Sequence, residues 1–279
     1  MKQIVISSNE ERTKGHMAAQ AVRKASAFLE ETFWLFCRAW QKTLHLPLVL
    51  ALVLALPAIT LWLLSQIFTS VHQVPSLSPA QSLSFFAPGM LVIAALFGSS
   101  FAGIGLLGDR DSGFLERLTA APIHRSAILL GKALADSSRT LLQAIILLIL
   151  LALLHTPMQT APLNLLSLLG LLAVFSLTFA GLSYLIALLT KSIEALMLIE
   201  MFLFLLLLFG SNALLPDNLL PGWMRIIALI NPVSHAVTVT RQLLAGSASL
   251  LTYSLTISAF AVIAGLEIGC TVWKLKRLT

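Results

Sequence analysis

Long runs of apolar residues, each wide enough to cross a lipid bilayer, constrain this chain more than any other feature. The hydrocarbon core of a bilayer is about 30 Å thick, and a helix of about 20 apolar residues spans it. Lipid offers the backbone no hydrogen-bonding partner and the runs lack the alternation of strands, so we expect helices. Six segments qualify: Leu48–Thr69, Phe86–Leu107, Ser137–Leu154, Leu163–Thr190, Ala195–Asn212 and Leu250–Val272.

Composition and charge support an all-α polytopic membrane protein. Of the 279 residues, 58% are hydrophobic and 11% are charged, whereas roughly a quarter are charged in a soluble domain. Apart from Arg225 and Arg241, every Lys and Arg falls before the first span, around the loop between spans two and three, at Lys191 or after the last span. Basic residues collect on the cytoplasmic side, so we expect both termini there. The net charge of +6 therefore needs no nucleic-acid partner.

The amino-terminal part of the chain divides into two segments ahead of the spans. Residues 1–24 are polar and mixed in charge, which predicts a flexible cytoplasmic arm. Residues 25–46 repeat apolar side chains at helical spacing, which predicts an amphipathic interfacial helix with Trp34 and Trp40 at the headgroups. Packing on a soluble partner is the alternative for this helix. Residues 47–279 then form the six-span membrane domain.

The segment 108–125, between the second and third spans, is too polar to dissolve in lipid. It opens with a glycine and acidic residues, predicts a short amphipathic helix through Phe114, Leu115 and Leu118, and stops at Pro122. A charged helix between two spans offers a surface that a soluble protein could bind. Its charged residues are Asp109, Arg110, Asp111, Glu116 and Arg117.

A second unusual segment, 212–246, precedes the last span. It holds three prolines and is too apolar for a free loop, and it predicts two short helices, at Pro221–Leu229 and Pro232–Leu244. Irregular backbone at membrane depth is tolerated only where protein or a water-filled cavity surrounds it. We therefore expect a re-entrant element that closes the outer end of a pathway. A segment lying flat on the outer leaflet is the alternative.

Two carboxylates fall inside predicted spans. Glu200 lies about one turn into the fifth span, and Glu267 lies near the inner end of the sixth. An intramembrane carboxylate is a functional candidate by default. Glu200 is near enough to the interface to snorkel or to pair with a neighbouring subunit, so structural pairing and a direct role in transport both stay open.

The sequence contains none of the common catalytic or nucleotide-binding motifs. It lacks a G-x-x-x-x-G-K-[ST] phosphate loop, H-E-x-x-H, G-x-S-x-G and any Cys/His cluster. We therefore predict no catalytic residue, no metal site and no cofactor bound by this chain. An ion-coupled transporter would need polar midplane sites on interrupted helices, and a membrane enzyme would need a cluster such as Glu200, Glu267 and His124. Energy is expected to enter through the inner charged loop.

Two motifs resemble those of permease subunits of the type-2 ABC exporter superfamily. The first motif is similar to the inner loop of that family, with Phe114 where Thr is usual. It reads Asp-Arg-Asp-x-Gly-x-Leu-Glu at 109–116, followed by Pro122 and by Leu-Gly-Lys at 130–132. The second motif is similar to the Asn-Pro-x-[ST]-Tyr…Arg motif of the same family, with His235 in place of Tyr. It reads Asn-Pro-Val-Ser-His at 231–235 and is followed by Arg241. The form resembles drug and antibiotic exporters of the daunorubicin-resistance type.

The resemblance implies a division of labour between chains. Two permeases, identical or related, would associate with two cytoplasmic ABC ATPase subunits that bind ATP and Mg. Phe114, Leu115 and Leu118 would fill an apolar groove of the ATPase while charged residues fix their position. The implied coupling residues are Asp109, Arg110, Asp111, Gly113, Phe114, Leu115, Glu116, Arg117, Leu118 and Pro122, and the implied outer gate residues are Asn231, Pro232, His235 and Arg241.

The expected cargo is an amphipathic small molecule or a lipid-like one, leaving the cytoplasm or inner leaflet across a bacterial cytoplasmic membrane. Export of a polysaccharide or lipid-linked glycan is the alternative within the same superfamily. Ion-coupled secondary transport is the alternative from a different class.

Overall fold

The computed structural model describes residues 26–45, positions 55, 59, 60, 62, 63 and 66, and residues 79–121, 123–154, 156, 161–190, 192–214 and 220–278. Every regular element within these residues is a helix. After a helix over residues 26–44 come α3 (Pro79–Ser100), α4 (Ala102–Asp111), α5 (Phe114–Ala120), α6 (Arg125–Leu153), α7 (Pro162–Leu189), α8 (Ile193–Phe209), α9 (Gly222–Ile230), α10 (Pro232–Leu244) and α11 (Leu250–Leu278). The predicted arm at 1–24 lies outside the described residues, as does most of the predicted first span.

Helices that could span a membrane account for most of the described chain. By length and hydropathy there are 4 among the described residues: Ser84–Asp111, which joins α3 and α4, together with Arg125–Leu153, Pro162–Leu189 and Leu250–Leu275. They fall on the predicted second, third, fourth and sixth spans. α8, with 17 residues, falls on the predicted fifth. The polytopic all-α prediction is thus confirmed, and the structure supports four of the six spans by this measure.

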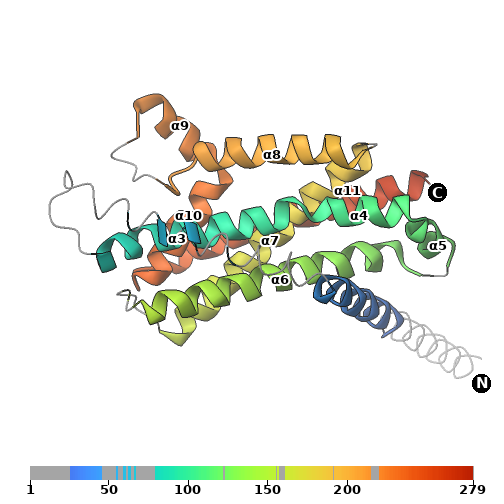
Figure 1. Cartoon of the computed structure of the whole chain (residues 1–279), viewed down its shortest axis with the longest axis horizontal. Coiled ribbons are helices and arrows are strands. Elements are labelled where there is room, and N and C mark those ends of the chain that lie inside the picture. The colour runs from blue at the N-terminus through green and yellow to red at the C-terminus, as the bar shows by residue number, and fades with distance from the viewer. Residues whose placement is uncertain are drawn as a thin grey trace, which may run out of the picture.

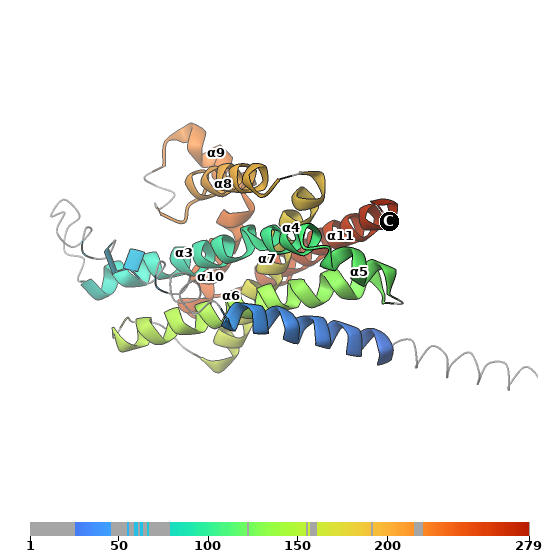
Figure 2. The ribbon, with the colours of Figure 1, turned by 45° about the vertical axis from the view of Figure 1, so that its right-hand side comes forward.

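Most of the helices run along the long axis of the molecule, with α7 at the centre (Figure 1). α7 packs against α11, α6, α3, α4, α10 and α8. α5 and the carboxyl end of α11 lie at one end, and α9 and α10 lie toward the other. The helix over residues 26–44 lies beside α6 near the α5 end (Figure 2). The predicted re-entrant segment therefore sits at the opposite end from the predicted coupling segment.

Two large apolar clusters, and a smaller one around Met90, form the core of the described bundle. One joins α3, α6, α7 and α10 through residues such as Leu91, Phe175 and Val237. The other joins α4, α5, α6, α7 and α11 through residues such as Leu106 and Leu129. Because lipid is as apolar as leucine, close packing of helices is one of the main stabilising contributions in such a bundle.

The second predicted span is interrupted at Phe101, between α3 and α4. A helix leaves its first backbone N–H groups without partners inside the helix, and Gly103 is the second residue of α4. Its N–H donates to the hydroxyl of Ser183 on α7, 2.7 Å away. A Cβ at Gly103 would lie 2.5 Å from the Ser183 carbonyl oxygen, so the absent side chain allows this contact.

We expect Gly103→Ala to destabilise the protein, although alanine favours helix. The added methyl group would force α4 and α7 apart, and overpacking of this kind costs about 1–3 kcal/mol. Thermal unfolding of the purified chain in detergent should show a lower midpoint. Gly108→Ala is the matched control, because a Cβ there meets nothing within 4 Å. Equal midpoints for the two variants would contradict the close contact.

Candidate functional site

α5 is the short helix that the sequence predicts between two spans. It follows Gly113, whose φ of 66° is left-handed and favours glycine. The N–H of Gly113 donates to the Arg110 carbonyl oxygen at 2.9 Å, which closes the turn after α4. Asp111, predicted to lie in the loop, instead ends α4. Pro122, predicted to stop the helix, lies outside the described residues, and α5 ends at Ala120.

The apolar face of α5 is turned toward this chain. Leu115 is 6% exposed and belongs to the core that includes Leu106. Leu118 is half-buried against the same core. The ring of Phe114 lies beneath the Arg38 guanidinium, whose central carbon is 3.2 Å from the ring centroid, a cation–π contact. The expectation that these apolar residues fill a groove of a partner is therefore wrong for Leu115, because the chain itself covers it.

The exposed surface of this segment is charged instead. Asp111, Glu116 and Arg117 are exposed. Arg110 is half-buried, and its guanidinium donates to the Asp111 carboxylate and to the Thr190 carbonyl oxygen, each at 3.3 Å. A soluble partner that approaches α5 would therefore meet charged side chains of both signs. We call Glu116 and Arg117, together with the adjacent Asp111 at the end of α4, the charged face of α5.

Asp109 is a buried linking residue and not part of that charged face. It is 4% exposed. Its two oxygens lie 2.5 Å from the ammonium groups of Lys42 and Lys132. A buried carboxylate is tolerated when it is paired and hydrogen-bonded. The cluster joins the helix over residues 26–44 to α4 and α6, and the sequence analysis did not identify it because its members are far apart in the chain.

The helix over residues 26–44 is docked on the bundle along much of its length. The Trp40 indole donates to the Ser138 hydroxyl at 2.7 Å. A Cβ at Gly131 of α6 would lie 2.8 Å from the Cβ of Leu35, so the two helices are in close contact. Of the two predicted headgroup residues, Trp34 is 73% exposed, whereas Trp40 packs on α6. The position of this helix in the headgroup plane stays a prediction.

A second polar cluster joins α6 to α7 near the same end. Asp136 pairs with Arg139 one turn away and accepts a hydrogen bond from the buried Tyr184 hydroxyl. This cluster could not be predicted from the sequence alone either. Acidic and basic residues three apart on a helix do suggest a pair, but nothing local indicates that Tyr184 joins them.

At the other end of the molecule, Asn231 and Pro232 start α10. The Asn231 side chain accepts a hydrogen bond from the Val233 N–H at 2.9 Å and donates to the Leu207 carbonyl oxygen at 2.8 Å. Pro232 follows as the first helical residue, where a missing N–H has little cost. Asn231 therefore caps α10 and ties it to the end of α8.

The other predicted gate residues also make contacts within the chain. A His235 ring nitrogen lies 3.0 Å from the Leu229 carbonyl oxygen of α9. The Arg241 guanidinium lies 4.9 Å from the Phe85 ring centroid of α3. Most of α10 is buried in the core. The two short helices predicted here are present, and their role as a gate stays a prediction.

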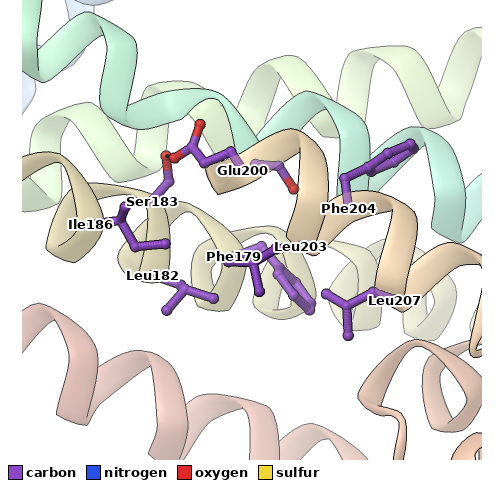
Figure 3. A pocket seen from close by; sticks show the side chains of 9 residues that line it. Phe179, Leu182, Ser183, Ile186, Glu200, Leu203, Phe204 and Leu207 are labelled. Atoms are coloured by element: carbon purple, nitrogen blue, oxygen red, sulfur yellow. Dashed lines mark hydrogen bonds between the residues drawn. The ribbon is translucent and has the colours of Figure 1, made fainter. Parts of the chain in front are cut away.

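Glu200 is buried within its own chain, between α7 and α8 (Figure 3). It is 2% exposed, and one of its oxygens accepts a hydrogen bond from Ser183. Of the alternatives left open by the sequence, snorkelling to the interface does not fit this buried position. Glu267 of α11 lies against Gly181 of α7. Each of the two carboxylates keeps one buried oxygen without a hydrogen-bond partner in the described part of the chain.

The described residues do not bring together a metal site. They contain no group of three or more His, Cys, Asp or Glu side chains that could hold a metal ion. His124, which the sequence analysis considered together with Glu200 and Glu267, instead contacts Glu31 at 3.0 Å. Cys37 and Cys270 are free thiols.

Comparison with known proteins gives a consistent result. Residues 30–245 match the family described as ABC-2 type transporter. A protein of Cyanophora paradoxa named as transport permease ycf38 is 32% identical over 85% of this chain and 82% of its own. The daunorubicin resistance ABC transporter permease DrrB1 of Streptomyces coeruleorubidus is 27% identical over 76% of this chain and 74% of its own. A Mycobacterium tuberculosis protein named as the doxorubicin resistance permease DrrC is 28% identical over 64% and 63%.

We expect Asp109→Asn to release the helix over residues 26–44 from the bundle. The change leaves Lys132 buried without its carboxylate, and breaking a buried pair costs about 3–5 kcal/mol, less here because Lys42 reaches solvent. Limited trypsin digestion should cut after Arg38 and Lys42 several-fold faster than in the parent protein.

Asp111→Asn serves as the control for that digestion, because it removes a nearby carboxylate that is exposed. We expect it to leave the cleavage rate unchanged. Equal protection of Arg38 and Lys42 in the parent and in Asp109→Asn would show that the buried cluster does not hold the helix.

Proposed function

The chain belongs to the ABC-2 type transporter family as a membrane permease, and from this premise we propose that it is the membrane-spanning subunit of an ATP-driven exporter. ATP and Mg would bind to a separate cytoplasmic ATPase. The proposed assembly holds two ATPase subunits and two permeases, identical or related, in a bacterial cytoplasmic membrane. It involves membrane lipid and no nucleic acid.

The charged face of α5 is the observation that carries this proposal. α5 is held by its buried residue Leu115 and by the turn at Gly113, while Asp111, Glu116 and Arg117 face outward. A contact surface of this kind can bind complementary charges on a soluble subunit and fix their register. Because α5 packs on the core, a displacement of its outer face would move α4 with it.

In the proposed cycle, ATP binding draws the two ATPase subunits together and moves α5. The bundle supplies the passage and the ATPase supplies the energy. We propose an amphipathic or lipid-like cargo that leaves the cytoplasm or inner leaflet, and the relatives named for resistance to daunorubicin and doxorubicin support a drug exporter.

Isolation of the chain with its partner tests this function directly. The tagged permease, extracted from its own membrane in mild detergent, should carry a soluble subunit that hydrolyses ATP. Inside-out vesicles should then accumulate an amphipathic dye only when ATP is present. Accumulation driven by a proton gradient without any ATPase would contradict the proposal and favour ion-coupled transport.

We expect Glu116→Lys to uncouple export from ATP hydrolysis. The substitution reverses a charge on the exposed face of α5, so the ATPase should dissociate or turn over without moving cargo. Dye accumulation in vesicles should fall at least about tenfold, which corresponds to about 1.4 kcal/mol, with normal expression of the permease.

Glu30→Lys is the matched control, because it reverses an exposed charge that belongs to the helix over residues 26–44 and not to the charged face of α5. It should retain export. Undiminished export by Glu116→Lys would show that α5 does not couple the two subunits.

A further inference from the structure

A pocket lies beside Glu200, between α7 and α8 (Figure 3). Its narrow part has room for about one water-sized group, and the empty space reaches about 260 Å³ only when the open solvent at its mouth is counted. The lining is apolar apart from Glu200 and two serines, and includes Phe179, Leu182, Leu203, Phe204 and Leu207. Leu182 and Leu207 lie across the pocket from the carboxylate.

The hydroxyl group of Ser183 acts as both an acceptor and a donor of hydrogen bonds. Its oxygen accepts the N–H of Gly103 at 2.7 Å, and its hydroxyl donates to one oxygen of Glu200. Ser183 therefore cannot also serve the second oxygen, which is buried and has no partner in the described part of the chain. Leaving a buried polar group unpaired costs free energy, and more so for a charged group.

Other buried acids of this bundle have basic partners built in. Asp109 has Lys42 and Lys132, and Asp136 has Arg139. Glu200 has no salt bridge of this kind among the described residues. Glu267 also keeps an unpartnered oxygen and lies against Gly181 of α7, whereas Glu200 lines the pocket. A carboxylate next to empty apolar space can accept a cation from outside the chain.

The chemistry of the pocket narrows the choice of cation. Calcium takes six to eight oxygen ligands, and one carboxylate beside two serine hydroxyls falls far short of that number. A protonated amine needs only one or two acceptors and can donate to a carboxylate in a charge-assisted hydrogen bond. The surrounding leucine and phenylalanine side chains suit an apolar or aromatic skeleton attached to that amine.

We propose that Glu200 binds the protonated amine of a cationic amphipathic molecule whose apolar part lies along Leu203, Leu207 and Phe179. This assignment rests on the proposed export function, and it names the class of cargo. The amine occupies the narrow part of the pocket and donates to the unpartnered oxygen. The skeleton extends through the open side of the pocket.

Equilibrium binding of two matched probes to the full chain in lipid nanodiscs tests the assignment. Naphthylmethylamine is cationic at neutral pH, and naphthylmethanol has nearly the same shape without the charge. After subtraction of binding to empty nanodiscs, the parent protein should prefer the amine. Glu200→Gln should weaken amine binding at least about tenfold, or about 1.4 kcal/mol, and leave the alcohol unchanged. Glu267→Gln, which removes the other unpartnered carboxylate, should bind both probes as the parent does.

Two results would overturn the site. The first is that the Glu200→Gln protein folds with the same unfolding midpoint as the parent and still binds the amine as tightly as the parent does. The other is an equal loss of both probes in that variant, which would assign Glu200 a purely structural role.

If Glu200→Gln does not fold, Leu203→Trp provides the test of the site. Its larger side chain fills the pocket and leaves the Glu200 carboxylate in place. It should abolish binding of both probes, and retained amine binding would overturn the site. These measurements use neither nucleotide nor ATPase, so a negative result leaves ATP-driven export standing. Loss of ATP dependence in vesicles would likewise leave this binding result unaffected.

Discussion

The buried carboxylate of Asp109, held between two lysines, is the interaction on which the α5 end of the molecule depends. It ties Lys42 of the amino-terminal helix to α4 and to Lys132 of α6. That attachment places Arg38 over the ring of Phe114, so the helix over residues 26–44 also covers part of α5. A paired charge in a buried place is weak evidence for stability, but it specifies which elements meet.

The contacts around α4 form a continuous set from α5 to Glu200. α4 leads into α5 through the turn at Gly113, and its first turn uses Ser183 to satisfy a backbone N–H. The same serine donates to Glu200. The helix that leads into α5 is therefore hydrogen-bonded to the residue that contacts Glu200. Any movement of α4 along its axis must act on that serine.

The two ends of the bundle are built by different means. At the α5 end, charged side chains link elements that are far apart in sequence. At the opposite end, α10 is buried among apolar side chains, and its start is set by the Asn231 cap and Pro232. α9 remains mostly exposed and apolar, with Trp223 and Ile230 facing outward. α9 and α10 thus combine a buried helix, α10, with an exposed helix, α9, that is suited to an apolar surrounding.

Hydropathy and local turn chemistry determined much of the fold from the sequence alone. Apolar runs of bilayer length specify helices wherever they occur, and the glycine and proline signals around α5 and α10 act within a few residues. The partners of Asp109, the burial of Leu115 and the contact of Glu200 with Ser183 were decided only by the tertiary structure. Each depends on how helices distant in the chain pack and rotate against one another, and a local pattern carries no information about that rotation.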